Sequence, residues 1–354
     1  MTNCHVLDED HDIAAKAALV LEHLRTSTML PAVFVRPSRH RAVSLIVAKT
    51  GPSMAREELA LLADIGLFIF AVDDLTDEGD VPIEELEGRL LRYADCAAGA
   101  YCPEVAFDPI ARFLGSIAAR LLRASGGDAL FGQWIARVRE MLAAMLAERR
   151  MSLAAASGGR APSLLEYLEV SRDSTGVAVV AAAAWMMMPE GPAAEAWPGL
   201  REAERHFSLA VRVANDLRGH ERERGEGKLD ALAIAGADQR GALWRRAADA
   251  LTDGRKALGR LAPAAGIPGR FLDRFASSVV ELYTTHDFHT LGEATPTGRD
   301  GAAASPPPRH AQAYMPRAGS SETRPAVAGS VIGTLEEAMS QREILRPTAA
   351  MEPA

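Results

Sequence analysis

Apolar residues recur at intervals of three and four from about residue 11 to residue 290, and they do not alternate with polar ones. Such spacing places one face of a helix toward a core and is typical of amphipathic α-helices. Ala, Leu, Glu and Arg, which favour helices, dominate the same region. Leu62, Ile65, Ile69 and Val72 form one such stripe. The pattern predicts a protein that is nearly all α.

Glycine and proline punctuate this region and divide it into segments long enough for helices of several turns. Clear breaks are Gly51-Pro52, Gly126-Gly127, Gly158-Gly159 and Gly266-Ile267-Pro268-Gly269. No fixed-period repeat and no hairpin signal interrupts the helical pattern. We therefore expect a single α-helical bundle over residues 11–294.

The character of the chain changes from about Thr295, where Gly, Ala, Ser and Pro become frequent and the apolar periodicity ends. Segments of this composition cannot bury enough apolar surface to offset the entropy lost on folding. Residues 295–354 are therefore predicted to form a disordered C-terminal tail.

The composition excludes some classes of function. The chain has 354 residues, of which 48% are hydrophobic, so it can build a sizeable core. Its net charge of −8 and its lack of a concentrated basic stretch argue against a nucleic-acid partner. Cys4, Cys96 and Cys102 fit free thiols in a reducing cytoplasm, and the acidic first residues lack the apolar segment of a secretory signal. We expect a cytoplasmic protein.

The longest apolar stretch, Val177 to Met188, holds about 12 residues against the roughly 20 that a membrane-spanning helix needs. We interpret it as a helix buried in the core, and we predict no membrane span.

Two acidic clusters, about 140 residues apart, carry the candidate chemistry. The first is Asp73-Asp74-Leu75-Thr76-Asp77, directly after an apolar run. Its carboxylates are three and four residues apart, so on a helix they converge on one side. Mg²⁺ usually binds through one or two carboxylates together with waters and substrate phosphates, which such a cluster can supply. A solvated helix end is the alternative interpretation of this cluster.

The second cluster begins at Asn215-Asp216, again after an apolar run. Asn215, Gly219 and Glu223 lie at successive intervals of four, which places all three toward one face of a helix. Asn215 and Glu223 supply two oxygen ligands, and Gly219 supplies no side chain. A surface helix rich in Glu and Arg is the alternative here.

Together, in this order and at this separation, the clusters resemble the aspartate-rich motif and the Asn-Asp…Ser/Thr…Glu triad of class I terpene synthases, the bacterial terpene cyclases. The resemblance covers roughly residues 15–290. It implies the helical bundle of that family, with a central apolar active-site cavity and three Mg²⁺ ions. The ligands that it implies are Asp73, Asp74 and Asp77 on one side and Asn215, Gly219 and Glu223 on the other.

The resemblance extends to the diphosphate contacts. Arg222 lies where the family often has a basic contact to diphosphate. Arg172, 43 residues before Asn215, resembles the arginine that senses diphosphate, with Thr175 as linker and Gly176 in the position of the effector carbonyl. Two departures stand out: Gly219 replaces the usual Ser or Thr, and the family's Arg-Tyr pair near the C-terminus is missing. Arg274, Tyr283, His286 and His289 are candidate substitutes for that pair.

The implied reaction is ionisation of a prenyl diphosphate to a carbocation, which is then cyclised or quenched as diphosphate is released. Metal ions and arginines stabilise the leaving group, and an apolar cavity keeps water from the cation. Helical spacing from the acids predicts the residues of the cavity wall, which are Leu62, Gly66, Ile69, Phe70, Phe207, Ser208 and Val211. Trp185 is the candidate to close the base of the cavity.

The substrate length is a separate prediction. Small residues, Gly66, Gly176 and the run Ala181 to Ala184, favour a roomy cavity and therefore a C20 substrate, geranylgeranyl or copalyl-type diphosphate. A sesquiterpene synthase that uses farnesyl diphosphate is the first alternative. A chain-elongating prenyl diphosphate synthase would carry a second aspartate-rich motif, which is missing, and a non-catalytic helical binding protein would show no turnover. The expected partner is the small-molecule substrate, and a homodimer is left open.

Overall fold

The computed structural model describes residues 3–29, 36–77, 81–100, 108–124, 128–189, 191–261, 265–286, 288 and 291. All regular elements of these residues are helical, which confirms the predicted all-α class. The predicted tail, residues 295–354, lies outside the described residues. The elements are α1 (Asn3–Thr26), α2 (Pro37–Thr50), α3 (Arg56–Asp77), α4 (Ile83–Ala97), α5 (Pro109–Ala124), α6 (Asp128–Ala156), α7 (Leu164–Ser171), η3 (Arg172–Thr175), α8 (Val177–Met187), η4 (Ala194–Ala196), α9 (Trp197–Gly225), α10 (Ala231–Ala235), η5 (Ala237–Gln239), α11 (Arg240–Leu261) and α12 (Gly266–Thr285).

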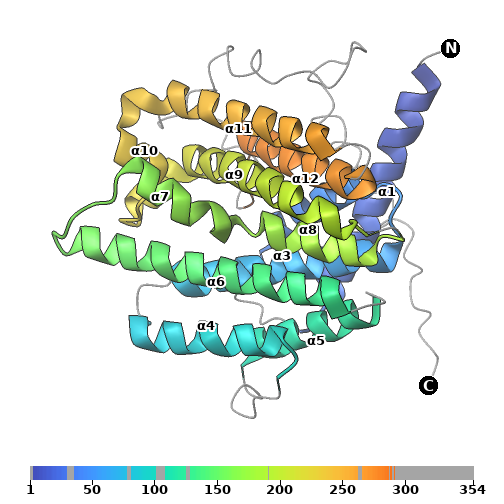
Figure 1. Ribbon diagram of the computed structural model, residues 1–354, viewed down its shortest axis with the longest axis horizontal. Coiled ribbons are helices and arrows are strands. Elements are labelled where there is room, and N and C mark those ends of the chain that lie inside the picture. Colours follow the sequence, from blue (N-terminus) through green and yellow to red (C-terminus); the bar gives the residue numbers. More distant parts are fainter. Residues whose placement is uncertain are drawn as a thin grey trace, which may run out of the picture.

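The helix α3 lies in the middle of the bundle, with α4 and α5 below it and α9, α11 and α12 above it in Figure 1. It packs against α1, α2, α5, α6 and α8. Its sequence suits this position because apolar side chains cover most of its circumference, and Leu62, Ile65 and Phe68 are fully buried. The acidic cluster that ends α3 is therefore carried on a helix held on several sides.

The apolar segment after Gly176 forms α8, and all of its residues except Ala178 are buried. A helix that is apolar all round belongs in a core, so the structure confirms the interpretation of this segment as a buried helix. Of the described helices, none combines the length and the apolar character needed to cross a bilayer.

The long helix α9 packs against α11, α12 and α8. Close approach to α11 depends on Gly254, because a Cβ built there would lie 2.8 Å from the ring of Phe207 on α9. The glycine thus lets two long helices meet across a buried aromatic side chain, which fixes the position of α9.

We predict that Gly254→Ala destabilises the protein by about 1–3 kcal/mol, because the added methyl group overpacks the contact with Phe207. Gly259, further along α11, is exposed and has no atom within 4 Å of a built Cβ, so Gly259→Ala is the matched control. The control should be neutral or more stable by up to about 1 kcal/mol, since alanine favours helices. Urea unfolding of both variants checks this, and equal effects would contradict it.

Candidate active site

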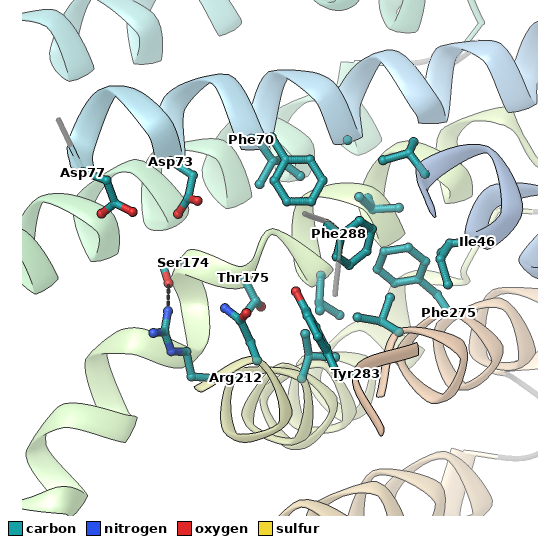
Figure 2. Close-up of a pocket in the computed structure, with 18 of the residues that line it drawn as sticks. Ile46, Phe70, Asp73, Asp77, Ser174, Thr175, Arg212, Phe275, Tyr283 and Phe288 are labelled. Atoms are coloured by element: carbon teal, nitrogen blue, oxygen red, sulfur yellow. Dashed lines mark hydrogen bonds between the residues drawn. The ribbon is translucent and has the colours of Figure 1, made fainter. Parts of the chain in front are cut away.

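A cavity opens beside the C-terminal half of α3 and is walled by α2, α3, η3, α8, α9 and α12, with one residue from α6. It encloses about 1190 Å³ of space outside atoms, its open mouth included. Acidic and basic side chains gather at one end and aromatic rings at the other, as Figure 2 shows for the labelled residues. The cavity therefore combines a charged end with an apolar end.

The three aspartates of the first acidic cluster do not share one face of α3. Asp73 and Asp77 line the cavity, where they point toward Ser174 and Arg212 (Figure 2). Burial, together with the charge of Asp77, raises the pKa of Asp73 to about 7. This helix end therefore holds two acids whose negative charges disfavour each other.

Asp74, one residue further round the helix, does not line the cavity. Its carboxylate accepts two hydrogen bonds from Arg39 of α2, at 2.5 and 2.7 Å. The buried Arg39 guanidinium also lies 4.8 Å from the ring centre of Phe70. The predicted convergence of all three aspartates thus fails at Asp74, because successive helical residues are turned by 100° and this one faces α2.

The second acidic cluster lies across the cavity on α9, where Asn215, Arg222 and Glu223 line the wall. Gly219 does not line it, and a Cβ built there would lie only 2.3 Å from Oε1 of Glu223. The space that a serine or threonine would occupy is therefore taken by the Glu223 carboxylate. This corrects the expectation that Gly219 is a ligand position open to the site.

Burial is also the main cause of the raised pKa values of two further acids in the wall. The pKa of Glu223 rises to about 8, with repulsion from Asp216 as the second cause. Glu148 of α6, which the sequence analysis did not single out, has its pKa raised to about 7 although Arg212 opposes the shift. The charged end thus gathers acids from three helices.

The predicted helix break is present between α7 and α8. Gly176 has φ +72°, a left-handed conformation that favours glycine, and a Cβ there would lie 2.4 Å from Cδ1 of Ile69. Its carbonyl oxygen accepts the first backbone hydrogen bond of α8, from Val180. The break leaves Thr175, together with Ser174, in the cavity wall.

Arg172 does not reach the cavity. Its guanidinium pairs with Glu169 at 3.0 Å and with Asp173 at 3.8 Å. The short 3-10 turn that follows α7 explains this, since Ser174 and Thr175 face inward while Arg172, two to three residues earlier, faces outward. The expectation that Arg172 contacts the diphosphate is therefore not met in this structure.

A different arginine lies at this end of the cavity. Arg212 of α9 is buried, and it pairs with Asp216 at 2.5 Å and with Glu148 at 3.1 Å. It also donates to the hydroxyl of Tyr167 at 2.7 Å. A second hydroxyl, that of Ser174, accepts from Arg212 at 3.4 Å, as the dashed line in Figure 2 marks. A fixed guanidinium thus faces the acids, and its position one turn before Asn215 was the signal available in the sequence.

Lys228 is the second basic residue that the sequence analysis missed. It lines the cavity from the segment between α9 and α10, and its Nζ lies 2.7 Å from Oδ2 of Asp77 and 2.5 Å from Oε2 of Glu226. Burial alone would lower the pKa of Lys228, but Asp77 and Glu226 outweigh it and the pKa is raised. The ammonium group is therefore charged and links the end of α3 to the end of α9.

The apolar end contains Leu62, Gly66, Ile69, Phe70 and Val211, as helical spacing predicted. Further lining residues come from α2, α8, α12 and the residue Phe288, and several are aromatic. Phe288 packs 4.9 Å from the ring of Phe70 and 5.5 Å from that of Tyr283, centre to centre (Figure 2). The lining residues that the sequence analysis did not predict here are Val43, Ile46, Val47, Val177, Val180, Phe275, Val279 and Phe288, with Tyr283 named only as a candidate diphosphate contact.

Three predicted wall residues do not line the cavity. Trp185 is fully buried, and its indole donates to the carbonyl of Pro268 at 3.0 Å, because it lies on the side of α8 opposite Val180. Phe207 packs against Gly254 of α11 instead, so its ring fills the contact between two helices. Ser208 is buried and is not among the residues that line the cavity. All three belong to the core.

The donor chemistry fits a hard divalent cation. Asp73, Asp77, Asn215 and Glu223 offer oxygen ligands, and burial disfavours the charged forms of Asp73 and Glu223 unless a cation accompanies them. Within the described part of the chain, no group of three or more His, Cys, Asp or Glu residues is close enough to hold a metal alone.

Comparison with known proteins identifies the class. The model of the terpene synthase family 2, C-terminal metal-binding family matches residues 64–254, more than half of the chain. The chain therefore belongs to this family and is a terpene synthase, an enzyme of the lyase class that acts on prenyl diphosphates. No curated protein matches the chain by sequence at a significant level.

Solved structures share the fold. The 2-methylisoborneol synthase of Streptomyces coelicolor A3(2), in complex with Mg²⁺ and 2-fluoroneryl diphosphate, is 16% identical, with a TM-score of 0.62 over 71% of this chain and 83% of that one. The linalool/nerolidol synthase of Streptomyces clavuligerus, in complex with 2-fluorogeranyl diphosphate, is 18% identical, with a TM-score of 0.61 over 77% of this chain and 94% of that one. At this identity the likeness establishes the fold.

The raised pKa values predict how stability depends on pH when metal is chelated. Between about pH 4 and pH 8 the folded protein keeps protons on Asp73 and Glu223 that the unfolded chain has lost, so stability falls as the pH rises. Asp73→Asn and Glu223→Gln should each be more stable than the wild type at pH 8 by about 1–3 kcal/mol, and the gain should vanish near pH 4.

Thermal unfolding in the presence of a chelator measures this effect. Asp253→Asn is the matched control, because the hydrogen bond from Lys256 lowers the pKa of Asp253 and its charge is favourable. The control variant should gain no stability at pH 8. A loss of stability in Asp73→Asn at that pH would contradict the assignment of a destabilising charge.

Proposed function

We propose that the chain is a Mg²⁺-dependent terpene cyclase that ionises an allylic prenyl diphosphate and cyclises or quenches the resulting carbocation. One observation carries the proposal: the acids of α3 and α9 line the same cavity at its charged end, and aromatic and aliphatic side chains line the rest. A substrate with a diphosphate head and a hydrocarbon tail complements these two ends.

Asp73 and Asp77 on one side, and Asn215 and Glu223 on the other, would hold the metal ions. Bound Mg²⁺ supplies Lewis-acid neutralisation of the charge that develops on the leaving diphosphate. Neither side has enough ligands to close a coordination shell alone, which fits the preference of Mg²⁺ for a few carboxylates plus phosphate oxygens. The proposed site holds three Mg²⁺ ions.

The basic residues at this end would bind and orient the diphosphate. Arg222 lines the wall with its side chain partly exposed, and Arg212 lies deeper beside Ser174. When the allylic C–O bond breaks, its electron pair leaves with the diphosphate, so donors fixed in advance stabilise the product of ionisation more than the substrate. Arg212 fits this role because four partners hold it in place.

The apolar end would receive the hydrocarbon and exclude water from the cation. Phe70, Phe275, Tyr283 and Phe288 present ring faces or edges to the cavity, and such faces attract a positive charge. Arg39 already lies against the ring of Phe70, so the cation would meet a less favourable field there. Phe275, Tyr283 and Phe288 are therefore the stronger candidates for stabilising the carbocation.

We propose farnesyl diphosphate, a C15 substrate, in place of the C20 substrate that small residues suggested. Of those residues only Gly66 lines the cavity. The Ala181 to Ala184 run is buried among its neighbours, and the space at Gly176 is taken by Ile69. Two of the three arguments for C20 therefore lose their support. One structure with the same fold is named a linalool/nerolidol synthase and holds a 2-fluorogeranyl diphosphate.

The direct test is incubation of the purified protein with geranyl, farnesyl, geranylgeranyl and copalyl diphosphates, with Mg²⁺ or with a chelator, followed by mass spectrometry. We expect a hydrocarbon or alcohol from farnesyl diphosphate, with release of diphosphate, only when Mg²⁺ is present. Turnover of a C20 diphosphate alone would overturn the assigned length. Elongation of the substrate with isopentenyl diphosphate would indicate a prenyltransferase.

We predict that Asp73→Ala and Asn215→Ala each lower kcat/KM by at least about 100-fold. Each substitution removes a ligand of the metal ions that neutralise the charge on the leaving group. Circular dichroism should remain that of the wild type, since both side chains line the cavity and do not pack in the core. Asp253→Ala on α11 is the control and should retain activity. Wild-type activity in either cavity variant would remove that residue from the site.

A further inference from the structure

Lys228 lies outside both acidic clusters, yet its side chain lines the cavity. Its backbone N–H donates to the carbonyl of Glu223 at 3.0 Å, which ties it to the end of α9. Gly227 has φ +69°, a conformation that reverses the chain after Glu226. The turn thus returns the Lys228 side chain over the mouth of the cavity, where it contacts Asp77 of α3.

A row of alternating charges results at the mouth. Asp77 pairs with Lys228 at 2.7 Å, Lys228 pairs with Glu226 at 2.5 Å, Glu226 pairs with Arg222 at 3.7 Å, and Arg222 pairs with Glu223 at 3.3 Å. The row joins the acids of the two helices across the site. The ammonium group of Lys228 is therefore a counter-ion for Asp77 that the protein itself supplies.

An ammonium group and a divalent cation compete for the same carboxylate oxygen. The Asp77 side chain is 41% exposed and that of Lys228 is 22% exposed, so their pair is of the kind that water weakens. A metal ion that must displace Lys228 from Asp77 therefore binds only about one- to fivefold more weakly than it would to the unpaired carboxylate. Lysine is suited to this exchange, because its flexible stem carries three donors that can turn to a new acceptor.

We propose that Lys228 is an exchange cation, which neutralises Asp77 in the ligand-free protein and binds the diphosphate once Mg²⁺ takes that carboxylate. The role rests on the proposed function and adds a residue outside both metal motifs. It also gives an order of events, since the ammonium group becomes available to the diphosphate only as the metal arrives. Lys228 thus couples metal binding to diphosphate binding.

Two variants test the exchange. Lys228→Gln removes the charge and keeps a polar side chain, and Lys228→Arg keeps the charge. Lys256→Gln is the matched control, because Lys256 forms a similar pair with Asp253, at 2.9 Å, on α11 away from the cavity. Calorimetry first measures Mn²⁺ binding to the ligand-free protein, and then Mg²⁺-dependent binding of inorganic diphosphate.

Lys228→Gln should bind Mn²⁺ about one- to fivefold more tightly than the wild type, because the competing ammonium group is gone. The same variant should bind diphosphate about 10- to 100-fold more weakly, since a charge-assisted hydrogen bond is lost. Lys228→Arg should retain most diphosphate binding, and Lys256→Gln should match the wild type in both measurements.

Weaker Mn²⁺ binding by Lys228→Gln would overturn the inference, because it would make Lys228 a support that positions Asp77. Unchanged diphosphate binding would overturn it as well, leaving Lys228 as a counter-ion only. Both outcomes presuppose a wild type that binds diphosphate with Mg²⁺. A wild type that fails to do so would instead reject the proposed function, and the exchange with it.

Discussion

The burial of carboxylates from three helices at one end of the cavity governs how the rest of the structure is arranged. Asp73, Glu148 and Glu223 come from these helices, and burial is the first cause that raises the pKa of each, with repulsion from neighbouring carboxylates as a further cause. Arg212 pairs with Glu148, and Lys228 pairs with Asp77. The protein therefore retains a charged end that favours the arrival of cations, and the fold must hold that end together by its apolar packing.

The packing of α3 holds its carboxylates at the cavity. The helix is packed on several sides and buries most of its length, so its acidic end cannot swing into solvent without disturbing the core. Arg39 pairs with the Asp74 carboxylate on the far side of the same helix, so one of the three aspartate charges of the cluster is neutralised there. Asp73 and Asp77 are left facing the cavity. One helix thus separates an acid that pairs with Arg39 from two acids that line the cavity.

Much of the fold and the site could be predicted from the sequence, because both depend on helical periodicity. Intervals of three, four, seven and eleven residues keep side chains close to one helical face, and they placed Leu62, Gly66, Ile69 and Phe70 in the same wall as Asp73. The buried character of α8 followed from its unbroken apolar run. Local patterns of this kind report which face of a helix is apolar.

The residues that were missed depend on how elements meet, which local patterns do not report. Arg172 matched a spacing, yet a single 3-10 turn rotates it away from the cavity and leaves Arg212 there instead. Lys228 reaches Asp77 across 151 positions of chain through a glycine turn. Phe207 was predicted in the wall from its helical spacing, and Trp185 as a residue that closes the base. Their contacts with Gly254 and Pro268 place both side chains in the core instead.

A crystal structure with Mg²⁺ and inorganic diphosphate would show whether α3 and α9 hold one anion between them through metal ions. We expect diphosphate between the two helices, with metal ions bound to Asp73 on one side and to Asn215 and Glu223 on the other. Metal ions held by one helix alone, or diphosphate bound outside this cavity, would contradict this expectation.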